Sequence, residues 1–211
     1  MTTEAAALSG RRRQAARNDT AILEAARDVF LADPKAPISA VAERAGVGIS
    51  ALYRRYANKE DLLRQLCRDG LRRYLAEAEQ AEQEADDWAA FTTFVTGVVD
   101  ADVHSLTVRL AGTFTPTPEM GEDAARAVAA ATRLFDRAQT SGRLRPGVVV
   151  QDIDLILEAC AAIRLPDVAR TRELRRRYLA VMLDGLATVE AGAPPGPAPE
   201  PGELNWRWQR R

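Results

Sequence analysis

Apolar residues recur at every third or fourth position along most of the chain, which is the spacing of one buried face of an α-helix. The first segment of this kind covers residues 21–31, and Asp19 or Thr20 precedes it as a candidate N-cap. Pro34 and Pro37 then interrupt the pattern, because proline cannot continue a helix. The pattern therefore predicts one helix followed by a short break.

Two short helices and a longer one are predicted after this break. Ser39 is a favourable N-cap for a helix that Gly46 ends after about two turns. Another short helix follows at residues 49–56, and Asn58 then caps a longer helix that starts at Lys59. Two short helices joined by a glycine-containing turn have the sequence form of a helix-turn-helix.

From about residue 86 the chain carries a second series of helical patterns with larger apolar residues. The expected helices cover residues 86–103, 104–114, 122–142, 153–164 and 170–190, with loops between them. No convincing strand hairpin is found. We therefore expect an all-α protein in which a three-helix N-terminal domain with the helix-turn-helix precedes a larger helical domain.

Composition marks two further regions at the ends of the chain. The stretch GRRRQAARND leads into the first helix, and residues 192–202 carry five of the eleven prolines. We therefore predict a flexible basic arm at 1–17, the helix-turn-helix domain at 18–64 and the larger helical domain at 65–191. Residues 192–211 are expected to form a proline-rich, disordered tail.

The charge is unevenly distributed although the net charge is only −1. Residues 1–75 hold 14 Lys and Arg against 9 Asp and Glu, and the remainder holds 15 against 21. A basic N-terminal third favours a polyanion as partner for this part of the chain.

The remaining composition excludes several classes of protein. No apolar run approaches the length of a membrane span, so we expect no membrane partner. Cys67 and Cys160 lie far apart, which fits a reducing compartment, and we expect a cytoplasmic protein. With His104 as the single histidine, neither a metal site nor a cofactor is expected, and an enzyme mechanism lacks an acid–base set.

The second short helix has an exposed face of distinctive composition, which is seen once the residues expected to be buried are set aside. Leu52 is expected to face inward, together with Tyr56 or its neighbour. The remaining side chains are small, hydroxyl-bearing or cationic, and they belong to Ile49, Ser50, Ala51, Tyr53, Arg54 and Arg55. Small residues allow close approach to base edges, arginine can donate two hydrogen bonds to guanine, and tyrosine can reach a phosphate. This face therefore predicts a helix that reads the major groove of DNA.

The segment APISAVAERAGVGISALYRRYANKEDLL resembles the N-terminal domain of the tetracycline-repressor (TetR) family of transcriptional regulators, and the match extends from about residue 18 to residue 71. Gly48 departs from the family pattern, in which serine or threonine usually caps the reading helix. The resemblance implies DNA contacts by Ser39, Gly48, Ile49, Ser50, Ala51, Tyr53, Arg54 and Lys59. Arg55 is added to this set for its chemistry, and Lys59 stands at a helix start where a phosphate is favoured.

The last two predicted helices carry apolar stripes that indicate a homodimer. One short helix reads only a few base pairs, so a two-fold pair is needed to read a palindromic operator. In the resembling family two helices from each subunit form a four-helix bundle. The predicted interface consists of Ile153, Ile156, Leu157, Cys160, Leu174, Tyr178, Met182 and Leu186. The alternative is that these stripes pack within one subunit.

The middle helices carry more large apolar residues than a thin bundle needs, and the resemblance implies a cavity for a small apolar effector there. The predicted lining is Phe91, Phe94, Val98, His104, Arg109, Phe114, Leu134 and Phe135. His104 and Arg109 are the polar candidates for orienting a ligand, with a surface histidine as the alternative. Each aromatic residue has ordinary core packing as its other interpretation.

The leading hypothesis is a homodimeric repressor that binds double-stranded DNA and is released by a small molecule. The basic arm either enters a neighbouring minor groove or is a tail with nonspecific attraction. The alternatives are a helical ligand-binding or scaffold protein without DNA binding, and an enzyme.

Overall fold

A computed structural model describes residues 19–187 and 189–203. None of these residues forms a β-strand, so the all-α prediction is confirmed for the described part of the chain. The chain divides into two compact units, which we call the head, ending at Cys67, and the body, beginning at Arg68. The predicted basic arm and residues 204–211 lie outside the described residues.

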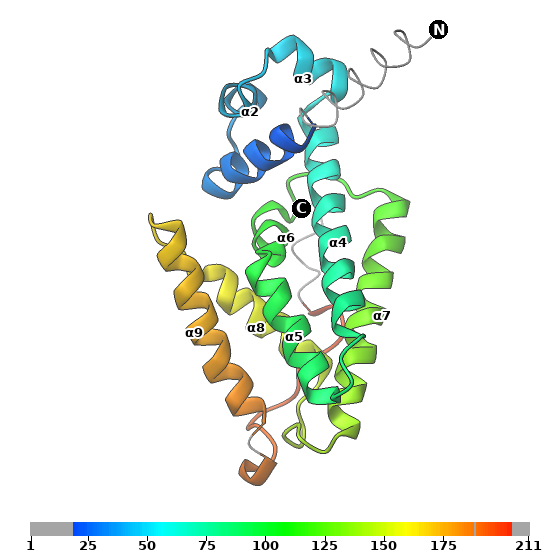
Figure 1. Cartoon of the computed structure of the whole chain (residues 1–211). Helices are drawn as coiled ribbons and strands as arrows, with labels where there is room; N and C mark the ends of the chain where they lie inside the picture. Colours follow the sequence, from blue (N-terminus) through cyan, green and yellow to red (C-terminus); the bar gives the residue numbers. More distant parts are fainter. Residues whose placement is uncertain (1–18, 188, 204–211) are drawn as a thin grey trace, which may run out of the picture. The chain divides into compact units, whose positions relative to one another are not determined.

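The head contains the predicted helix-turn-helix. Residues 19–32 are helical, α2 covers Ile38–Ala45, α3 covers Ile49–Arg55, and α4 starts at Lys59 and ends at Ala81 (Figure 1). Gly46 turns the chain between α2 and α3 with a φ of 65°, a conformation that glycine adopts without strain. The small core of the head consists of buried side chains, among them Phe30, Val41, Leu52, Leu62 and Leu63.

The helix caps of the head differ in part from the predictions. Asn58 caps α4 as expected, because its side-chain oxygen accepts a hydrogen bond of 2.9 Å from the backbone N–H of Asp61. Ser39 is not a cap: α2 begins at Ile38, and Pro37 takes the cap position without a side-chain hydrogen bond. Asp19 is itself helical, and its carboxylate binds other groups, as described below.

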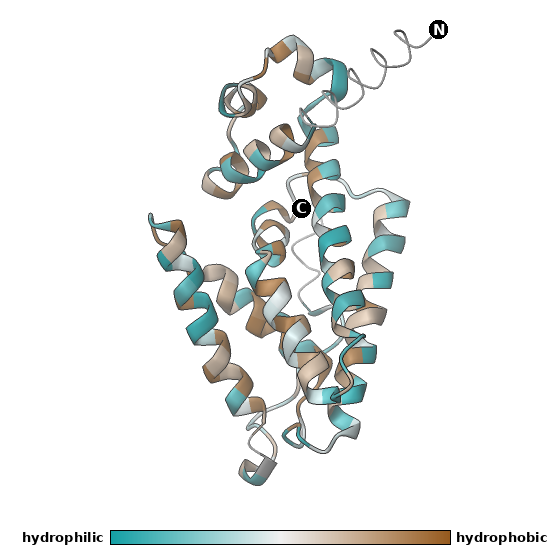
Figure 2. Cartoon of the chain, viewed as in Figure 1, coloured by the Kyte–Doolittle hydropathy of each residue, from teal (hydrophilic) through white to brown (hydrophobic). Residues whose placement is uncertain are grey.

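The body is a bundle built around α5. Its helices are the later part of α4, α5 (Asp87–Asp100), α6 (Val103–Leu110), α7 (Pro118–Thr140), α8 (Val150–Ala162) and α9 (Val168–Leu186), followed by a 3-10 turn at Val189–Ala191. Helix α5 packs against each of α6, α7, α8 and α9. Figure 2 shows α5 coloured mainly brown and white, which agrees with its central, apolar position.

Aromatic side chains fill the core of the body. The ring of Tyr74 on α4 meets the ring of Phe94 edge to face at 5.2 Å, and Phe91 meets Phe135 of α7 at 6.2 Å. Such edge-to-face pairs add about 1 kcal/mol each to the burial of the rings. The core is therefore closed by specific contacts between three helices.

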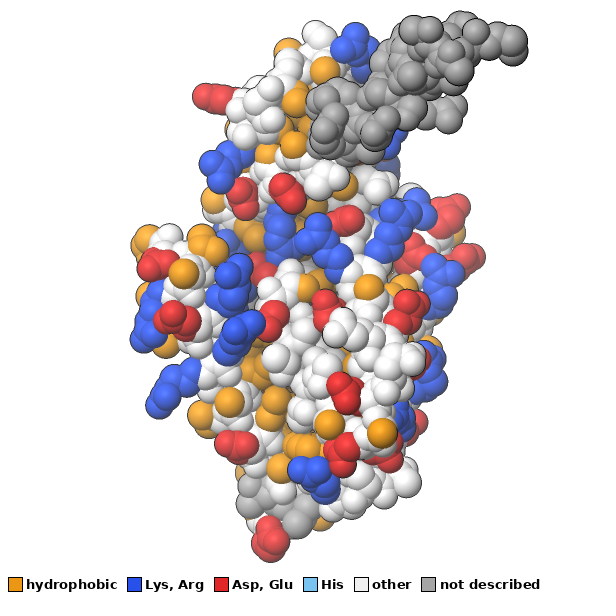
Figure 3. Space-filling model, viewed as in Figure 1, with side chains coloured by type: hydrophobic (Ala, Val, Ile, Leu, Met, Phe, Trp, Pro, Cys, Tyr) orange, Lys and Arg blue, Asp and Glu red, His pale blue; other side chains and the backbone are white. Residues whose placement is uncertain are grey.

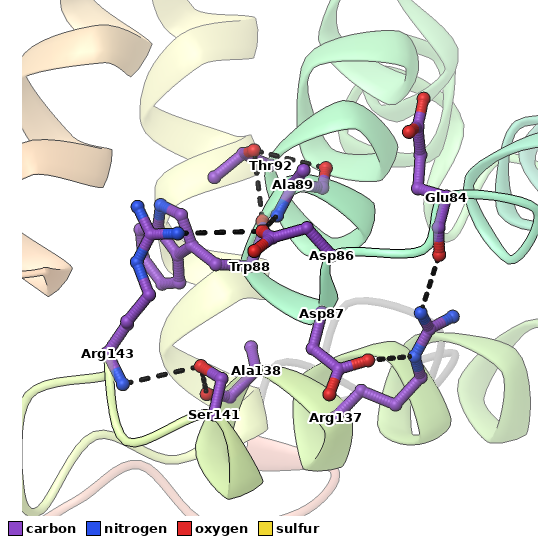
Figure 4. A network of polar contacts seen from close by, with 10 residues as sticks. All are labelled: Glu84, Asp86, Asp87, Trp88, Ala89, Thr92, Arg137, Ala138, Ser141 and Arg143. Atoms are coloured by element: carbon purple, nitrogen blue, oxygen red, sulfur yellow. Dashed lines mark hydrogen bonds and ion pairs between the residues drawn. The ribbon is translucent and has the colours of Figure 1, made fainter.

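Polar groups fix the start of α5 against the end of α7 (Figure 4). The Asp86 carboxylate accepts a hydrogen bond of 2.6 Å from the Ala89 N–H, so it caps α5. Arg137 of α7 donates to the Asp87 carboxylate at 2.8 Å and to the Glu84 carbonyl at 2.7 Å. These contacts explain why the helix begins where it does and why the α4–α5 loop is held to α7.

One arginine of α9 is buried in the body. The Arg175 side chain is 7% exposed and donates to the Asp102 carboxylate and, at 3.2 Å, to the Ser105 hydroxyl. It also donates to the Ile163 carbonyl at 3.0 Å and to the Ala161 carbonyl at 3.2 Å. Arg175 thus joins α9 to the end of α8 and to the start of α6.

The chain beyond α9 returns to the loop before α8. The Arg145 N–H donates to the Leu186 carbonyl at 2.7 Å, and the Arg145 side chain donates to the carbonyl of Gly192. The first residue of the proline-rich tail therefore has a defined contact. No helix in the described part of the chain has the length and apolar character needed to cross a membrane.

Candidate nucleic-acid interface

Helix α3 has one face in the core of the head and one face in solvent. Leu52 is fully buried and Tyr56, directly after the helix, is buried beside it. The Tyr53 side of the helix is outside, where Tyr53 is 49% exposed, and Ile49, Ser50 and Arg54 are also exposed. The apolar spacing predicted that Leu52, with Tyr56 or its neighbour, faces the core and that these four residues face solvent. The structure has this orientation.

Two long polar side chains on this face are available for a ligand. Among the described residues, neither Tyr53 nor the Arg54 guanidinium has a hydrogen bond or an ion pair. An unpaired guanidinium can donate a bidentate pair to a guanine edge or to a phosphate, and a phenol hydroxyl can donate to a phosphate. Exposed Ser50 and half-buried Ala51 are small, so they allow close approach to base edges.

Arg55, the last residue of α3, has an internal partner. Its Nε donates to the Asp19 carboxylate at 2.7 Å and its second nitrogen donates to the other carboxylate oxygen. The Tyr56 hydroxyl donates to the same carboxylate at 3.2 Å. The Arg55 guanidinium lowers the pKa of the Asp19 carboxyl, and burial raises the pKa of Tyr56 to about 12.

Lys59 points into the head. Its Nζ donates to the Pro34 carbonyl at 3.0 Å and to the Ala36 carbonyl at 2.7 Å, and it lies 4.9 Å from the centre of the Phe30 ring. Desolvation lowers the pKa of Lys59. The ammonium, which the sequence suggested for a phosphate, is thus occupied in joining the start of α4 to the loop before α2.

The other predicted DNA contacts take distinct places in the head. Ser39 lies exposed in the first turn of α2, and Gly48 lies exposed at the N-cap position of α3. Sequence reasoning named Asp19 only as a candidate N-cap and missed its contact with Arg55 and Tyr56. It also missed the 2.8 Å pair between Arg44 of α2 and Asp28 of the first helix.

The residues predicted for a dimer interface separate into two groups. Ile153, Leu157 and Cys160 of α8 are buried in the core of the body, so these three side chains add little to the exposed surface of the single chain. Tyr178 is exposed, and the half-buried members are Ile156, Leu174, Met182 and Leu186. Val181, which belongs to the same apolar stripe of the last helix, is 57% exposed on α9, and Leu155 is exposed on α8.

The residues predicted for a ligand cavity lie mostly in a filled core. Phe91, Phe94, Val98, Phe114, Leu134 and Phe135 are buried, while Arg109 is exposed. Val98 and His104 line a cavity of about 10 Å³ together with Ser105, Cys160 and Arg175. This is room for about one water molecule.

A second hollow on the body is open and charged. It has a volume of about 570 Å³ between the start of α5 and the end of α7, and it is lined by Glu82, Asp87, Arg133, Asp136, Arg137 and Thr140. Such a lining does not suit an apolar effector. Within residues 19–187 and 189–203, no group of histidine, cysteine and acidic side chains is placed to hold a metal ion.

Comparison with protein families places both units among bacterial regulators. The profile described as "Bacterial regulatory proteins, tetR family" matches residues 22–66. The profile described as "Transcriptional regulator SbtR-like, C-terminal domain" matches residues 86–188. Comparison with curated proteins gives no match.

Solved structures of regulators share this fold. The chain is 25% identical to the TetR transcriptional regulator SCO0520 from Streptomyces coelicolor, with a TM-score of 0.59 and coverage of 80% of this chain and 97% of the other. It is 27% identical to a TetR transcription regulatory protein from Mycobacterium vanbaalenii, with a TM-score of 0.57 and coverage of 84% and 99%. It is 26% identical to the TetR-like regulator LfrR from Mycobacterium smegmatis, solved in complex with proflavine, with a TM-score of 0.62 and coverage of 82% and 96%.

Proposed function

The chain belongs to the tetR family of bacterial regulatory proteins, which are DNA-binding transcriptional regulators and not enzymes, and we propose that it is a homodimeric, cytoplasmic repressor that a small apolar molecule releases from a palindromic operator. The observation that carries the proposal is the face of α3. There Tyr53 and Arg54 are exposed without partners among the described residues, while Leu52 anchors the helix in the core.

The length of α3 supports a dimer. The helix has seven residues, about 10 Å, and can contact only a few base pairs. A two-fold partner doubles the contacts and places the second α3 about one duplex turn away, which a palindromic operator matches. The exposed apolar side chains of α9 and α8, Tyr178, Val181 and Leu155, supply a candidate surface for the pair.

The surroundings of this surface fit a protein partner of the same kind. Charged side chains of both signs lie over α9 in Figure 3, and arginines outnumber acidic residues along this helix. Arg170 pairs with Glu173 and Arg176 pairs with Asp100, while exposed Arg172 and Arg177 add positive charge beside the apolar side chains. An apolar stripe with a polar rim is the usual composition of such an interface.

The release step requires the core of the body to open. Small-molecule sites have volumes of about 300–1,000 Å³, whereas the cavity beside His104 and Arg175 holds about 10 Å³. A ligand that binds only an opened body shifts the population away from the closed form. The affinity for DNA then falls by an amount set by the difference between the ligand's affinities for the two forms. The aromatic core, with Phe91, Phe94 and Phe135, favours an uncharged apolar ligand.

Fluorescence anisotropy with duplexes from the protein's own upstream region tests DNA binding. We expect saturable binding to one duplex, much weaker binding to a shuffled duplex, and a steep loss of affinity between low and physiological salt because phosphate contacts release counterions. Equal affinity for every duplex contradicts an operator, and no binding at low salt favours the alternative of a ligand-binding protein without DNA function.

Light scattering coupled to size-exclusion chromatography tests the pair. We expect twice the mass of the 211-residue chain for the wild type, and mainly single chains for Val181→Asp, which places a charge in the candidate surface. Titration of the DNA complex with a panel of uncharged apolar compounds tests release. The proposal of an apolar effector fails if none of them displaces the protein from DNA.

A further inference from the structure

The Asp19 carboxylate binds both residues at the end of the reading helix. It accepts two hydrogen bonds from the Arg55 guanidinium and one, at 3.2 Å, from the Tyr56 hydroxyl. Asp19 belongs to the first helix, 36 residues before Arg55 in the chain. One side chain thus joins α3 to a helix that takes no part in the helix-turn-helix itself.

Helix α3 depends on such external anchors. A seven-residue helix is too short to be stable alone. Its N-cap is Gly48, which supplies no side-chain hydrogen bond. Leu52 holds the middle of the helix in the core, but a single buried side chain leaves the helix free to tilt about it. The contact of Asp19 with Arg55 and Tyr56 removes this freedom at the C-terminal end.

The geometry distinguishes this pair from an ordinary surface ion pair. Isolated exposed pairs contribute little, but bidentate arginine–carboxylate pairs and networks are the exception. Although the Arg55 side chain is 61% exposed, that of Asp19 is only 27% exposed. Tyr56 is buried, so its hydroxyl fixes the carboxylate from the protein side.

We propose that Asp19 is a positioning residue for DNA binding, which acts through Arg55 and Tyr56 to hold α3 at the angle that presents Tyr53 and Arg54. We call the contact of Asp19 with Arg55 and Tyr56 the brace. Arg55 then takes part in the brace and does not contact a phosphate. The inference rests on the proposed function, since it concerns how the reading face is oriented. It predicts an effect of unusual sign: removal of a negative charge from a DNA-binding head weakens binding, although electrostatics alone makes it stronger.

The first test compares two charge-matched variants by fluorescence anisotropy on the operator duplex. Asp19→Asn removes the carboxylate of the brace, and we expect the affinity to fall by about 5- to 10-fold. Glu43→Gln removes the same charge from exposed Glu43 of α2, whose carboxylate has no partner among the described residues. We expect unchanged or tighter binding for Glu43→Gln. Equal or tighter binding by Asp19→Asn overturns the proposal.

The second test asks whether Asp19 acts through Arg55. In an Arg55→Gln background only the hydrogen bond from the Tyr56 hydroxyl to Asp19 remains, so the further change Asp19→Asn is expected to cost much less than it does in the wild type. The salt dependence separates the two roles of Arg55. If Arg55 bound a phosphate, its removal would reduce the slope of log affinity against log salt by about 0.9 for each head, whereas removal of the brace alone leaves the slope of the Arg55→Gln variant close to wild type. Additive losses, or a reduced slope, contradict the brace.

The third test needs no DNA, so it distinguishes failure of the brace from failure of the proposed function. Hydrogen exchange of wild type and Asp19→Asn is compared over α3, with the amides of α2 as a measure of whether the head is folded. We expect faster exchange at the end of α3 and unchanged exchange in α2. If exchange in α3 is unchanged, the brace is disproved; if wild type binds no duplex while α3 loosens as expected, only the DNA-binding proposal fails.

Discussion

Arg55 in the head and Arg175 in the body bind similar groups in different surroundings. Each guanidinium binds an aspartate, Asp19 or Asp102, and in each case that aspartate also accepts a hydrogen bond from a hydroxyl group nearby. The Arg55 side chain is 61% exposed, and that of Arg175 is 7% exposed. The hydrogen bonds of Arg55 in the head therefore compete with water, whereas those of Arg175 in the body are shielded from it.

The difference in exposure changes what each arginine can do. In the head, water can solvate Arg55 and part of Asp19 when the other is removed, so we expect a small change in stability, and the main effect is on the orientation of α3. Inside the body, removal of one partner leaves other groups without hydrogen bonds, and this costs several kcal/mol. We therefore expect the Arg55 pair to affect DNA binding and the Arg175 pair to affect folding.

The largest effect is expected for Arg175→Met. Methionine fills similar space but removes the arginine donor from the Ser105 hydroxyl, from two carbonyls and from the Asp102 carboxylate, which keeps its hydrogen bond from Ser105. We expect a loss of about 3 kcal/mol in the free energy of unfolding, and a melting temperature lower by about 10 °C. Urea unfolding and thermal melting measure it. The neighbouring Arg176→Met is the control, because Arg176 also binds an aspartate but is exposed, and it should leave stability nearly unchanged.

The next effect is expected for Arg54→Ala, which acts on binding alone. Arg54 has no partner among the described residues, so its removal leaves the fold intact. We expect the operator affinity to fall by about 2 kcal/mol per head with an unchanged melting temperature and an unchanged dimer. Arg72→Ala, an exposed change on α4 in the body, is the matched control. Wild-type affinity of Arg54→Ala would remove this residue from the reading face.

The head shows which features of the structure could be predicted from the sequence. The turn at Gly46 and the facing of α3 could be predicted, because glycine and the spacing of Leu52 and Tyr56 act locally. The family resemblance read from the same segment is confirmed by the family profiles. The direction of Lys59 could not be predicted: a long side chain at a helix start reaches a phosphate or a nearby carbonyl equally well.

The body was harder to predict for a different reason. Helix α8 is apolar on more than one side, so periodicity does not tell whether Leu157 or Leu155 faces inward, and the structure buries Leu157. Arg175 had a weak signal in the sequence, since it shares a helical face with Leu179 four residues later. Its partner Asp102 lies 73 residues away, and no local pattern connects the two.

A smaller effect is expected when acid titrates the pair of Asp19 and Arg55. Arg55 lowers the pKa of Asp19 below its ordinary value of 3.8, so the unfolded state binds a proton more readily than the folded state. The pair therefore stabilises the head above that value, and this stabilisation disappears as the pH falls through the lower, folded-state pKa. Hydrogen exchange of α3 followed from about pH 6 to about pH 3 measures this. The difference in the hydrogen-exchange rate of α3 between wild type and Asp19→Asn should shrink in acid. A difference independent of pH would contradict this prediction.

The smallest effect concerns the two thiols, and it reports on the two units separately. Cys67 lies at the end of the head unit and Cys160 in the core of the body, and burial raises their pKa values to about 12 and about 11. Because the thiolate is the reactive form, both should react slowly with a disulfide reagent near neutral pH, and the buried Cys160 only through opening of the surrounding structure, whereas Cys67 is half-buried. Reaction of Cys160 is expected to accelerate in Arg175→Met but not in Arg176→Met, while Cys67 keeps its rate in both, since the groups that Arg175 binds lie in the body. Equal acceleration of both thiols would show that head and body open together, and the separation of roles between Arg55 and Arg175 would then be wrong.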